Sequence, residues 1–441
     1  MTNSPSLLDP TLEQLLALDK EHLETSDLPI VTVSATYKED LKSWYGFEAD
    51  DTTPDIVFSR AHYSMALGIA VEAWQTQMDP QKAWLIDPTN YVNRKNLKQV
   101  QLTEVIGKTL ARNPILKAFK DLVDKFGRNK LPILKSITPS LLYLTRDINK
   151  PILSMHVAAG NILAESGKTV FQMITDPHVR GDYTQNAHLP NLYFGVFDDR
   201  TKAEFMEKAR LSGIKASAER IIVTGPPIDP RIIAARFNKK PHHSGKLRLC
   251  LTTGGLGTNK PEIRRVLEQL LPELRRHDDW LQLVVYAGTQ ADINDMVIEM
   301  AREARVSLGK PHEKGQALRL LYHPQIVDAN EMLIKYGFPW ADGFISKPSG
   351  DMAYDAAAAG CFLLTLAEWG EWEHNVREVF EQKNIARRAQ VEQIVAQIKA
   401  LSEPLEGQKS WMENAMCEAL SIDELFLNGA KNIASATKSI K

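Results

Sequence analysis

The chain has 441 residues, of which 44% are hydrophobic and 24% are charged, and its formal net charge is −2. This length favours two domains over a single core, and the ordinary composition is typical of a soluble globular protein. The nearly neutral charge predicts no general attraction to nucleic acid. The three cysteines are scattered, and two lie in apolar runs, which indicates buried thiols rather than disulfides or metal ligands.

The N-terminus lacks the basic and apolar regions of a signal peptide, and no apolar run is long enough to cross a membrane. We therefore expect a cytoplasmic protein. In the first half, apolar runs alternate with helical patterns, which predicts a parallel, doubly wound sheet. The expected strands are 29–33, 55–59, 83–87, 152–156, 169–176, 192–197 and 220–224, and the expected helices are 8–24, 65–74, 98–146, 158–166 and 201–211.

The polar, basic and turn-rich segment 238–246 is the best candidate for a linker. Alternation then resumes, so a second doubly wound domain is predicted. Its expected strands are 247–253, 281–286, 318–322, 343–346 and 361–366, with helices at 261–271, 351–359 and 388–437. A loop that contains Glu373 and Asn375 is expected after the strand 361–366. The predicted organisation is a first domain over 1–237, a second over 247–400, and C-terminal helices over 401–441.

A turn with the sequence Lys347-Pro-Ser349-Gly350 joins the strand 343–346 to the small-residue helix 351–359. Such a turn leaves backbone N–H groups at a helix N-terminus, which suits an anion such as phosphate. Asp355 lies one helical turn further on, where its carboxylate could accept hydrogen bonds from sugar hydroxyls. An ordinary β-α-β unit with a serine cap explains the same residues equally well.

A second turn, with Thr253, Gly254, Gly255 and Gly257, follows the strand 247–253 and precedes a helix. Glycines let a backbone approach a ligand closely and leave amides available to phosphate. The spacing is not that of the dinucleotide fingerprint, which needs Gly-x-Gly-x-x-Gly. A tight turn without a ligand is the alternative interpretation.

The segment 341–376 resembles the donor-binding signature of glycosyltransferases related to the peptidoglycan N-acetylglucosaminyltransferase and the monogalactosyldiacylglycerol synthases. Asp355 stands where these families usually have Glu, and Glu371 where Gln is common. The turn at 253–257 is similar to their Gly-Gly-x-Gly loop, and Ile326 lies where they read uracil through backbone groups. The residues that fall on the signature in order are Lys347, Ser349, Gly350, Asp355, Gly360, Glu373 and Asn375.

The resemblance implies an α/β protein with two Rossmann-like doubly wound domains facing a cleft, the GT-B architecture. It also implies an acceptor-side first domain, a donor-binding second domain, and final helices that cross back to the first. The implied reaction is inverting and needs neither a metal nor a cofactor. It moves a hexose or N-acetylhexosamine from a UDP-sugar to a hydroxyl acceptor, for which a lipid is one candidate. No Asp-x-Asp motif occurs in a fitting strand-loop context, which agrees.

Two residues of the first half are candidates for the catalytic base. Asp176 ends the strand 169–176, at the ligand-binding edge of a parallel sheet, and matches a Thr-Asp pair in the lipid-acceptor families. Capping of the next turn is its alternative role. His62 matches a family histidine, although the glycines that flank it in the family are missing, and imidazole titrates near neutral pH. A structural hydrogen bond is the alternative for His62, and His156 is a second candidate.

The stretch 108–135 carries eight basic side chains against two aspartates, interleaved with apolar residues. This composition is typical of a helix on an anionic membrane surface, and it would place the protein at the inner face of the membrane. A solvated helix with one packed side is the alternative.

Two rival functions stay open. One is a UDP-sugar epimerase of the same architecture, and the other is a non-catalytic protein that binds nucleotide sugars.

Overall fold

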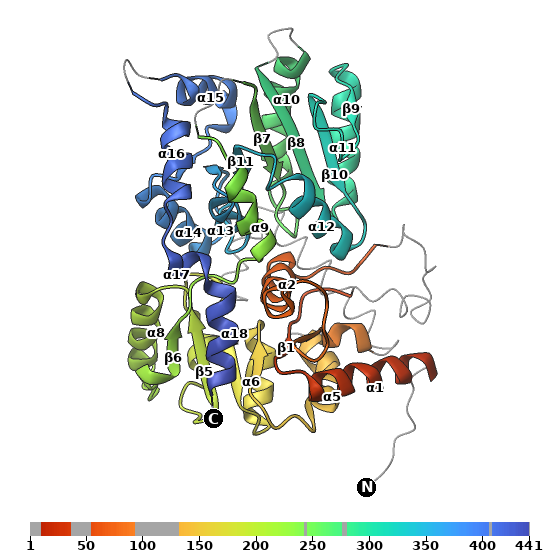
Figure 1. The fold of residues 1–441 in the computed structure, drawn as a ribbon, viewed down its shortest axis with the longest axis vertical. Coiled ribbons are helices and arrows are strands. Elements are labelled where there is room, and N and C mark those ends of the chain that lie inside the picture. Colours follow the sequence, from red (N-terminus) through yellow and green to blue (C-terminus); the bar gives the residue numbers. More distant parts are fainter. Residues whose placement is uncertain are drawn as a thin grey trace. The chain divides into compact units, whose positions relative to one another are not determined.

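The computed structural model describes residues 10–36, 54–92, 132–241, 245–275, 280–404 and 408–440 (Figure 1). Contacts divide the chain into two compact units. The first contains the described residues up to Thr175, those of 179–227, and the C-terminal segment from Lys431. The second contains 176–178 and the described residues of 228–430.

The first unit is built on a six-stranded sheet in the order β2-β1-β3-β4-β5-β6, and all of these strands pair in parallel. The strands are β1 (Pro29–Val31), β2 (Trp84–Ile86), β3 (Ile152–Ser154), β4 (Val170–Met173), β5 (Leu192–Val196) and β6 (Ile221–Val223). The helices are α1 (Pro10–Thr25), α2 (Arg60–Trp74), α5 (Pro132–Thr145), α6 (Val157–Glu165), α7 (Gly181–Thr184) and α8 (Asp199–Leu211).

The strands of this sheet are apolar because both faces are covered, as parallel sheets require. Ile152, Val170 and Phe194 belong to one core with Leu141 of α5 and Phe205 of α8. Helix α8 begins where the Asp198 carboxylate accepts from the backbone N–H of Thr201, which caps the helix at 2.7 Å.

One expected strand of the first half is wrong. Residues 55–59 contribute only an isolated antiparallel bridge between Val57 and Ala35. Residue 59 instead caps helix α2, because the Ser59 hydroxyl accepts from the backbone N–H of His62 at 3.2 Å. Helix α2 therefore begins five residues earlier than its apolar run predicts.

The second unit is built on a seven-stranded parallel sheet in the order β13-β12-β11-β7-β8-β10-β9. The strands are β7 (Leu247–Thr252), β8 (Leu281–Gly288), β9 (Leu308–Gly309), β10 (Leu318–Tyr322), β11 (Gly343–Ser346), β12 (Phe362–Thr365) and β13 (Ala386–Arg388). The helices are α9 (Pro230–Ala235), α10 (Lys260–Arg275), α11 (Ala291–Glu303), α12 (Ile326–Tyr336), α13 (Met352–Ala358), α14 (Glu371–Gln382), α15 (Ile394–Ser402), α16 (Trp411–Leu420) and α17 (Glu424–Leu427).

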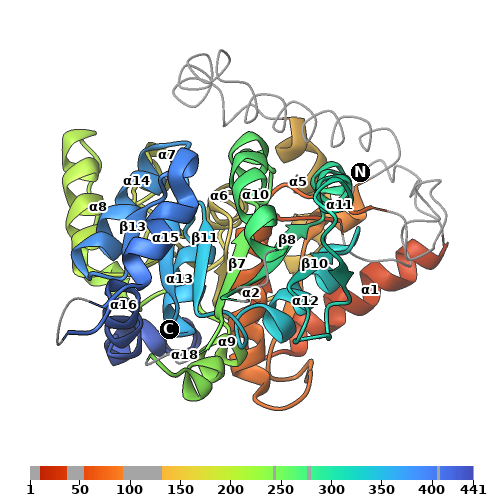
Figure 2. The same ribbon diagram turned by 90° about the horizontal axis from the view of Figure 1, so that it is seen from above.

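Helices cover both faces of the second sheet. Helices α10 and α11 pack together against β8, while α12 contacts β8 and β10, and Figure 2 shows α10 and α11 across the sheet from α12. Helix α10 is amphipathic, and its buried side chains recur at helical spacing: Ile263, Val266, Leu267, Leu270 and Leu271. Every residue of β8 is buried, as expected for a central parallel strand.

The final helix, α18 (Gly429–Ser439), joins the first unit from Lys431 onwards. Its Asn432 side chain donates to the Thr224 carbonyl, after β6, at 3.0 Å. The segment after Pro227 belongs to the second unit, because α9 packs against α13 and the Lys239 ammonium donates to the Phe338 carbonyl at 2.7 Å.

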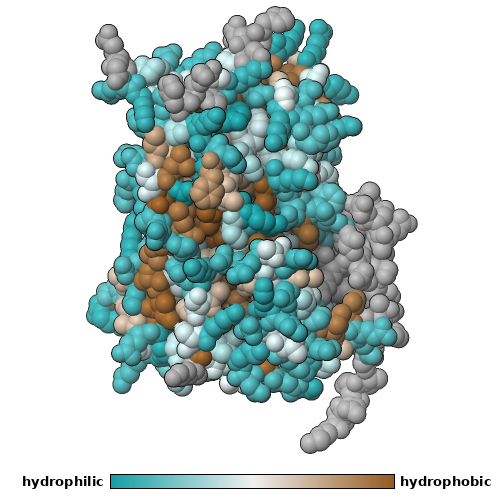
Figure 3. All heavy atoms as spheres, viewed as in Figure 1, coloured by the Kyte–Doolittle hydropathy of each residue, from teal (hydrophilic) through white to brown (hydrophobic). Residues whose placement is uncertain are grey.

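Hydrophilic residues predominate on the face drawn in Figure 3, although apolar residues gather over part of it. Within the described ranges, no helix is long and apolar enough to cross a membrane. The basic stretch 108–135 falls largely outside the described residues, which resume at 132.

Candidate active site

The glycine-rich turn between β7 and α10 is held tightly against the turn that follows β11. Gly257 has a φ of +62°, a conformation that favours glycine, and its N–H donates to the Gly254 carbonyl at 2.8 Å. A Cβ on Gly254 would lie 3.5 Å from Cδ of Lys347. The Thr252 hydroxyl donates to Ser346 Oγ at 2.7 Å, which joins the ends of the two strands. Two turns that are about 90 residues apart in the sequence thus form one site.

This site contains buried polar groups for which the described part of the chain supplies no hydrogen-bond partner. Asn259, directly before α10, is 4% exposed, and neither its Oδ1 nor its Nδ2 has a hydrogen-bond partner among the described residues. The Thr258 hydroxyl is also buried and has no hydrogen-bond partner among the described residues. Buried polar atoms are nearly always hydrogen-bonded, so two neighbouring exceptions at the N-terminus of a 16-residue helix indicate a position for a polar ligand. The sequence pattern alone did not single out either residue.

Lys347 and Glu373 form a buried ion pair at the carboxyl edge of the sheet. Lys347 Nζ lies 2.6 Å from Glu373 Oε1, and their side chains are 8% and 5% exposed. Glu373 Oε2 accepts from the backbone N–H of Trp369 at 2.5 Å, so both carboxylate oxygens are engaged. We expected Glu373 and Asn375 in a loop, but both lie in α14, which begins at Glu371. Helix formation there turns Glu373 inward to Lys347.

Ion pairs between Glu368 and two arginines hold the segment between β12 and α14. Glu368 accepts from Arg377 and, at 2.7 Å, from Arg388. The Trp369 ring centroid lies 5.9 Å from Lys347 Nζ and 5.6 Å from the ring of Trp372, which it meets edge-on. The Trp369 ring therefore lies beside the ammonium group, and the Trp372 ring packs against it. Neither tryptophan was among the site residues predicted from the sequence.

The charge of Lys347 also affects the pKa of a second carboxylate, that of Glu262. Burial raises the pKa of Glu262, in the first turn of α10, whereas a backbone hydrogen bond from Ala367 and the Lys347 ammonium act in the opposite direction. The Ala367 N–H donates to the Glu262 carboxylate at 3.3 Å, which joins the first turn of α10 to the segment that follows β12.

The turn after β11 caps its own helix. The Ser349 hydroxyl accepts from the Met352 N–H at 3.2 Å and donates to Asp351 Oδ1 at 2.6 Å. Helix α13 has seven residues, all of them buried, and Asp355 is 5% exposed within it. Gly350 lies in the turn beside them. Because Asp351 brings a buried carboxylate to this helix N-terminus, the glycine-rich turn at α10 is the better place for an anion. The sequence analysis did not assign Asp351 to the site.

The remaining predicted donor residues lie at other points of the second unit. Ile326 is the first residue of α12, directly beyond the carboxyl end of β10, and is 1% exposed. The Asn375 side chain donates to the Pro177 carbonyl at 3.0 Å. No described contact brings Ile326 or Asn375 to Lys347, so their assignment to the donor site stays a prediction.

The predicted catalytic residues gather at the carboxyl edge of the first sheet. His62 lies in the first turn of α2, and its Nε2 is 3.3 Å from the Thr175 hydroxyl, which follows β4. The ring centroid of His156, which follows β3, is 5.2 Å from that of His62, and the rings meet edge-on. Asp176 is the next residue after Thr175, and its contacts assign it to the second unit. Two imidazoles and a hydroxyl thus form the polar cluster of this edge.

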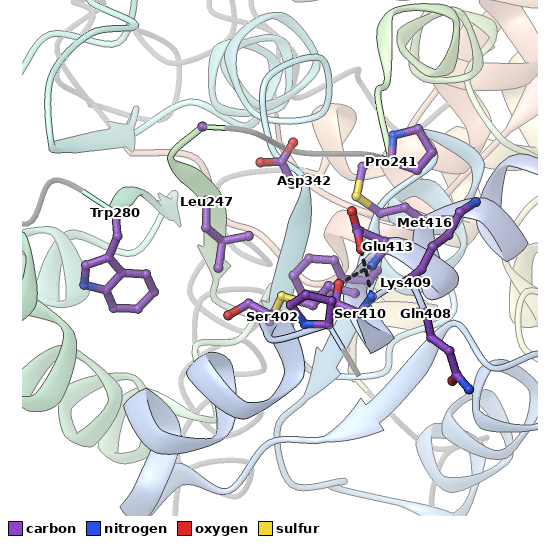
Figure 4. A pocket seen from close by; sticks show the side chains of 14 residues that line it. Pro241, Leu247, Trp280, Asp342, Ser402, Gln408, Lys409, Ser410, Glu413 and Met416 are labelled. Carbon is purple, nitrogen blue, oxygen red and sulfur yellow. Dashed lines mark hydrogen bonds between the residues drawn. The ribbon is translucent and has the colours of Figure 1, made fainter. Parts of the chain in front are cut away.

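A separate cavity of about 520 Å³ lies in the second unit (Figure 4). It borders the amino ends of strands, since Leu247 begins β7, Phe362 begins β12 and Trp280 directly precedes β8. Ser410 and Glu413 in its wall form the capping box of α16. None of the predicted donor-binding residues lines this cavity, which lies at the opposite edge of the sheet from Lys347.

Within the described ranges, no group of three or more His, Cys, Asp or Glu side chains is placed to hold a metal ion. No protein-family model matches the chain, and a search of curated proteins finds no significant match.

Solved structures share its fold. The UDP-GlcNAc 2-epimerase from Neisseria meningitidis bound to UDP-GlcNAc is 12% identical, with a TM-score of 0.51 over 93% of this chain and 99% of that one. The α,α-trehalose 6-phosphate synthase from Burkholderia multivorans is 14% identical, with a TM-score of 0.51 over the same shares. MurG from Acinetobacter baumannii is 12% identical, with a TM-score of 0.49, and the match covers 93% of this chain and 99% of that one.

Both sheets are parallel and covered by helices, and the similarity extends over nearly the whole chain. The chain therefore has the two-domain Rossmann-like fold of the GT-B glycosyltransferases.

Proposed function

We propose that the protein is an inverting, metal-independent glycosyltransferase that moves a hexose or N-acetylhexosamine from a UDP-sugar to a hydroxyl acceptor. The observation that carries the proposal is the site where the glycine-rich turn meets Lys347. A buried cation, a closely approached backbone and the Asn259 amide, which has no partner among the described residues, occur together at the N-terminus of α10. These are the groups that a diphosphate needs.

In this proposal the second unit binds the donor. Lys347 and the turn at 253–257 hold the diphosphate and stabilise it as it leaves, and Ser349 and Gly350 form the neighbouring turn of the donor site. Asp355 accepts hydrogen bonds from the ribose, and backbone groups beside Ile326 read the uracil. Stabilisation of a leaving diphosphate by fixed N–H groups and an ammonium requires no metal.

The first unit supplies the base. His62 is our first candidate, because its ring lies within hydrogen-bonding distance of Thr175 and next to His156 in a polar cluster. Asp176 is the alternative, as a carboxylate that follows β4 of the first sheet, although its own contacts assign it to the second unit. Either group would take the proton of the acceptor hydroxyl as the hydroxyl attacks the anomeric carbon from the face opposite the diphosphate.

The deciding experiment incubates the protein with a panel of UDP-sugars, in the presence and in the absence of candidate hydroxyl acceptors. UDP release and the sugar product are both measured. We expect UDP release that depends on an acceptor. Conversion of one UDP-sugar into its epimer without UDP release would instead identify an epimerase. Binding without either change would identify a nucleotide-sugar-binding protein.

Glu373 and Asn375 are expected to act on the sugar rather than the nucleotide. Replacing either with Ala should reduce turnover of the UDP-sugar by at least about tenfold, while UDP affinity does not fall in parallel, because the contacts matter most in the transition state. Initial rates and calorimetric UDP binding, measured on the same preparations, test this. A parallel loss of both quantities would show that the two residues support the nucleotide.

We also propose peripheral contact with an anionic membrane through Lys117, Lys120, Lys125 and Arg128, residues outside the described ranges. Each could contribute about 1 kcal/mol near such a surface. In a flotation assay we expect binding to anionic vesicles that falls as salt rises, and none to neutral vesicles. Equal, negligible flotation with both at low salt would favour a soluble acceptor.

A further inference from the structure

The Lys347–Glu373 pair occupies the position where the proposed function requires a diphosphate. Lys347 contributes its charge to the glycine-rich turn, yet its ammonium already contacts a carboxylate at 2.6 Å. That carboxylate is anchored on its other side by the Trp369 N–H. In this arrangement Glu373 offers Lys347 what a phosphate oxygen would offer, a negatively charged acceptor at hydrogen-bonding distance.

Two anions beside the same buried ammonium would repel each other. The Lys347 residue is 6% exposed, and its Cδ lies within van der Waals contact of the position that a Cβ on Gly254 would take. Glu262 is a further carboxylate close enough for its pKa to be affected by Lys347. A diphosphate that bound beside an unmoved Glu373 would therefore meet uncompensated negative charge in a poorly hydrated site.

We propose that Glu373 competes with the donor's phosphates for Lys347 and thereby sets how tightly the nucleotide is held. When a nucleoside diphosphate binds, Lys347 exchanges the carboxylate of Glu373 for a phosphate oxygen. When the sugar has been transferred, Glu373 returns to Lys347 and displaces the UDP product. The inference rests on the proposed function, because it requires a nucleotide to bind at this site.

The test compares calorimetric binding of UDP and of uridine to the wild-type protein, Glu373→Gln and Glu299→Gln. Glu299 is the matched control, because it is an exposed glutamate of the second unit, in α11, and its substitution makes the same change of charge outside the predicted donor site. Glu373→Gln should bind UDP about tenfold more tightly than the wild-type protein, since phosphate no longer displaces a charged partner from Lys347. Glu299→Gln should change UDP affinity by no more than about twofold, as befits an exposed charge.

Uridine, which carries no phosphate, should bind Glu373→Gln and the wild-type protein equally. The stability of Glu373→Gln supplies a second readout, since the variant leaves Lys347 without its buried partner. Its melting temperature should be lower than that of the wild-type protein without nucleotide, and UDP should raise it further than it raises the wild-type value. If Glu373→Gln does not fold, Glu373→Asp, which keeps the charge but shortens the side chain, should bind UDP with a smaller gain.

The outcomes separate this inference from the proposed function. If the wild-type protein and every variant fail to bind UDP, the proposed function fails and the inference fails with it. If the wild-type protein binds UDP, and Glu373→Gln binds it no more tightly than Glu299→Gln does, the competition is refuted while the donor site stands. An equal gain for UDP and uridine would also refute it, because the effect would not involve phosphate.

Discussion

Replacing Lys347 with Met should lower the free energy of unfolding of the protein by about 3–5 kcal/mol, the cost of leaving a buried charge without its partner. Glu373 is buried, and Lys347 holds one of its two oxygens. The same substitution removes the cation of the donor site, so UDP binding should also be lost. Chemical denaturation followed by circular dichroism measures the first effect, and calorimetry measures the second.

The double variant Lys347→Met/Glu373→Gln separates these two effects. Because neither side chain is then charged, most of the stability should return, while UDP binding should stay weaker than in the wild-type protein. Glu299→Gln again serves as the exposed control and should leave stability within about 0.5 kcal/mol of wild type. If the double variant were as unstable as Lys347→Met alone, the pair would not be the source of the loss.

Asp355→Ala should weaken UDP binding by about 1–3 kcal/mol, the contribution of a charge-assisted hydrogen bond to the ribose. Asp355 lies in α13, a helix whose seven residues are all buried, directly beyond the Ser349-Gly350 turn. Calorimetry on a variant whose circular dichroism spectrum matches the wild-type spectrum tests the assignment. Unchanged UDP affinity in that variant would remove Asp355 from the donor site.

Asp355→Glu tests the same residue in the other direction. It restores the residue that the resembled families carry, with one more methylene of reach, so UDP affinity should stay within about twofold of wild type. The extra methylene must fit among small buried side chains, however, and overpacking of a core typically costs about 1–3 kcal/mol. A comparison of its melting temperature with that of Asp355→Ala will show whether packing or recognition dominates.

Much of the fold follows from local pattern. The run Leu281–Gly288 is apolar except for Gln282 and becomes a fully buried central strand, and the stripe that includes Ile263 and Leu270 becomes the inner face of α10. A continuous apolar run and a repeat at helical spacing can each be recognised within a short stretch of sequence. The alternation of such elements is sufficient to predict a parallel, doubly wound sheet in each half.

Other features were decided by capping and by contacts distant in the sequence. Residues 55–59 have a β-branched pattern, but the Ser59 hydroxyl starts a helix and takes His62 into its first turn. Glu373 lies in a stretch that the sequence pattern assigns to a loop, and α14 begins before it. At 55–59 the capping hydrogen bond of α2 outweighed the strand preference of the sequence. At Glu373 the formation of α14 outweighed the loop preference.

The sequence by itself determined that a glycine-rich turn and a Lys-Pro-Ser-Gly turn each follow an apolar strand. Only the tertiary structure decided that they form one site, because β7 and β11 are neighbours in the sheet and their carboxyl ends meet at one edge. The parallel pairing of β11 with β12 likewise places Glu373, 26 residues beyond Lys347 in the chain, at 2.6 Å from it. The Asn259 amide beside the glycine-rich turn is buried and unpaired within the described residues. A spacing in the sequence carries no information on which side chains meet across a sheet edge, so these contacts required the structure.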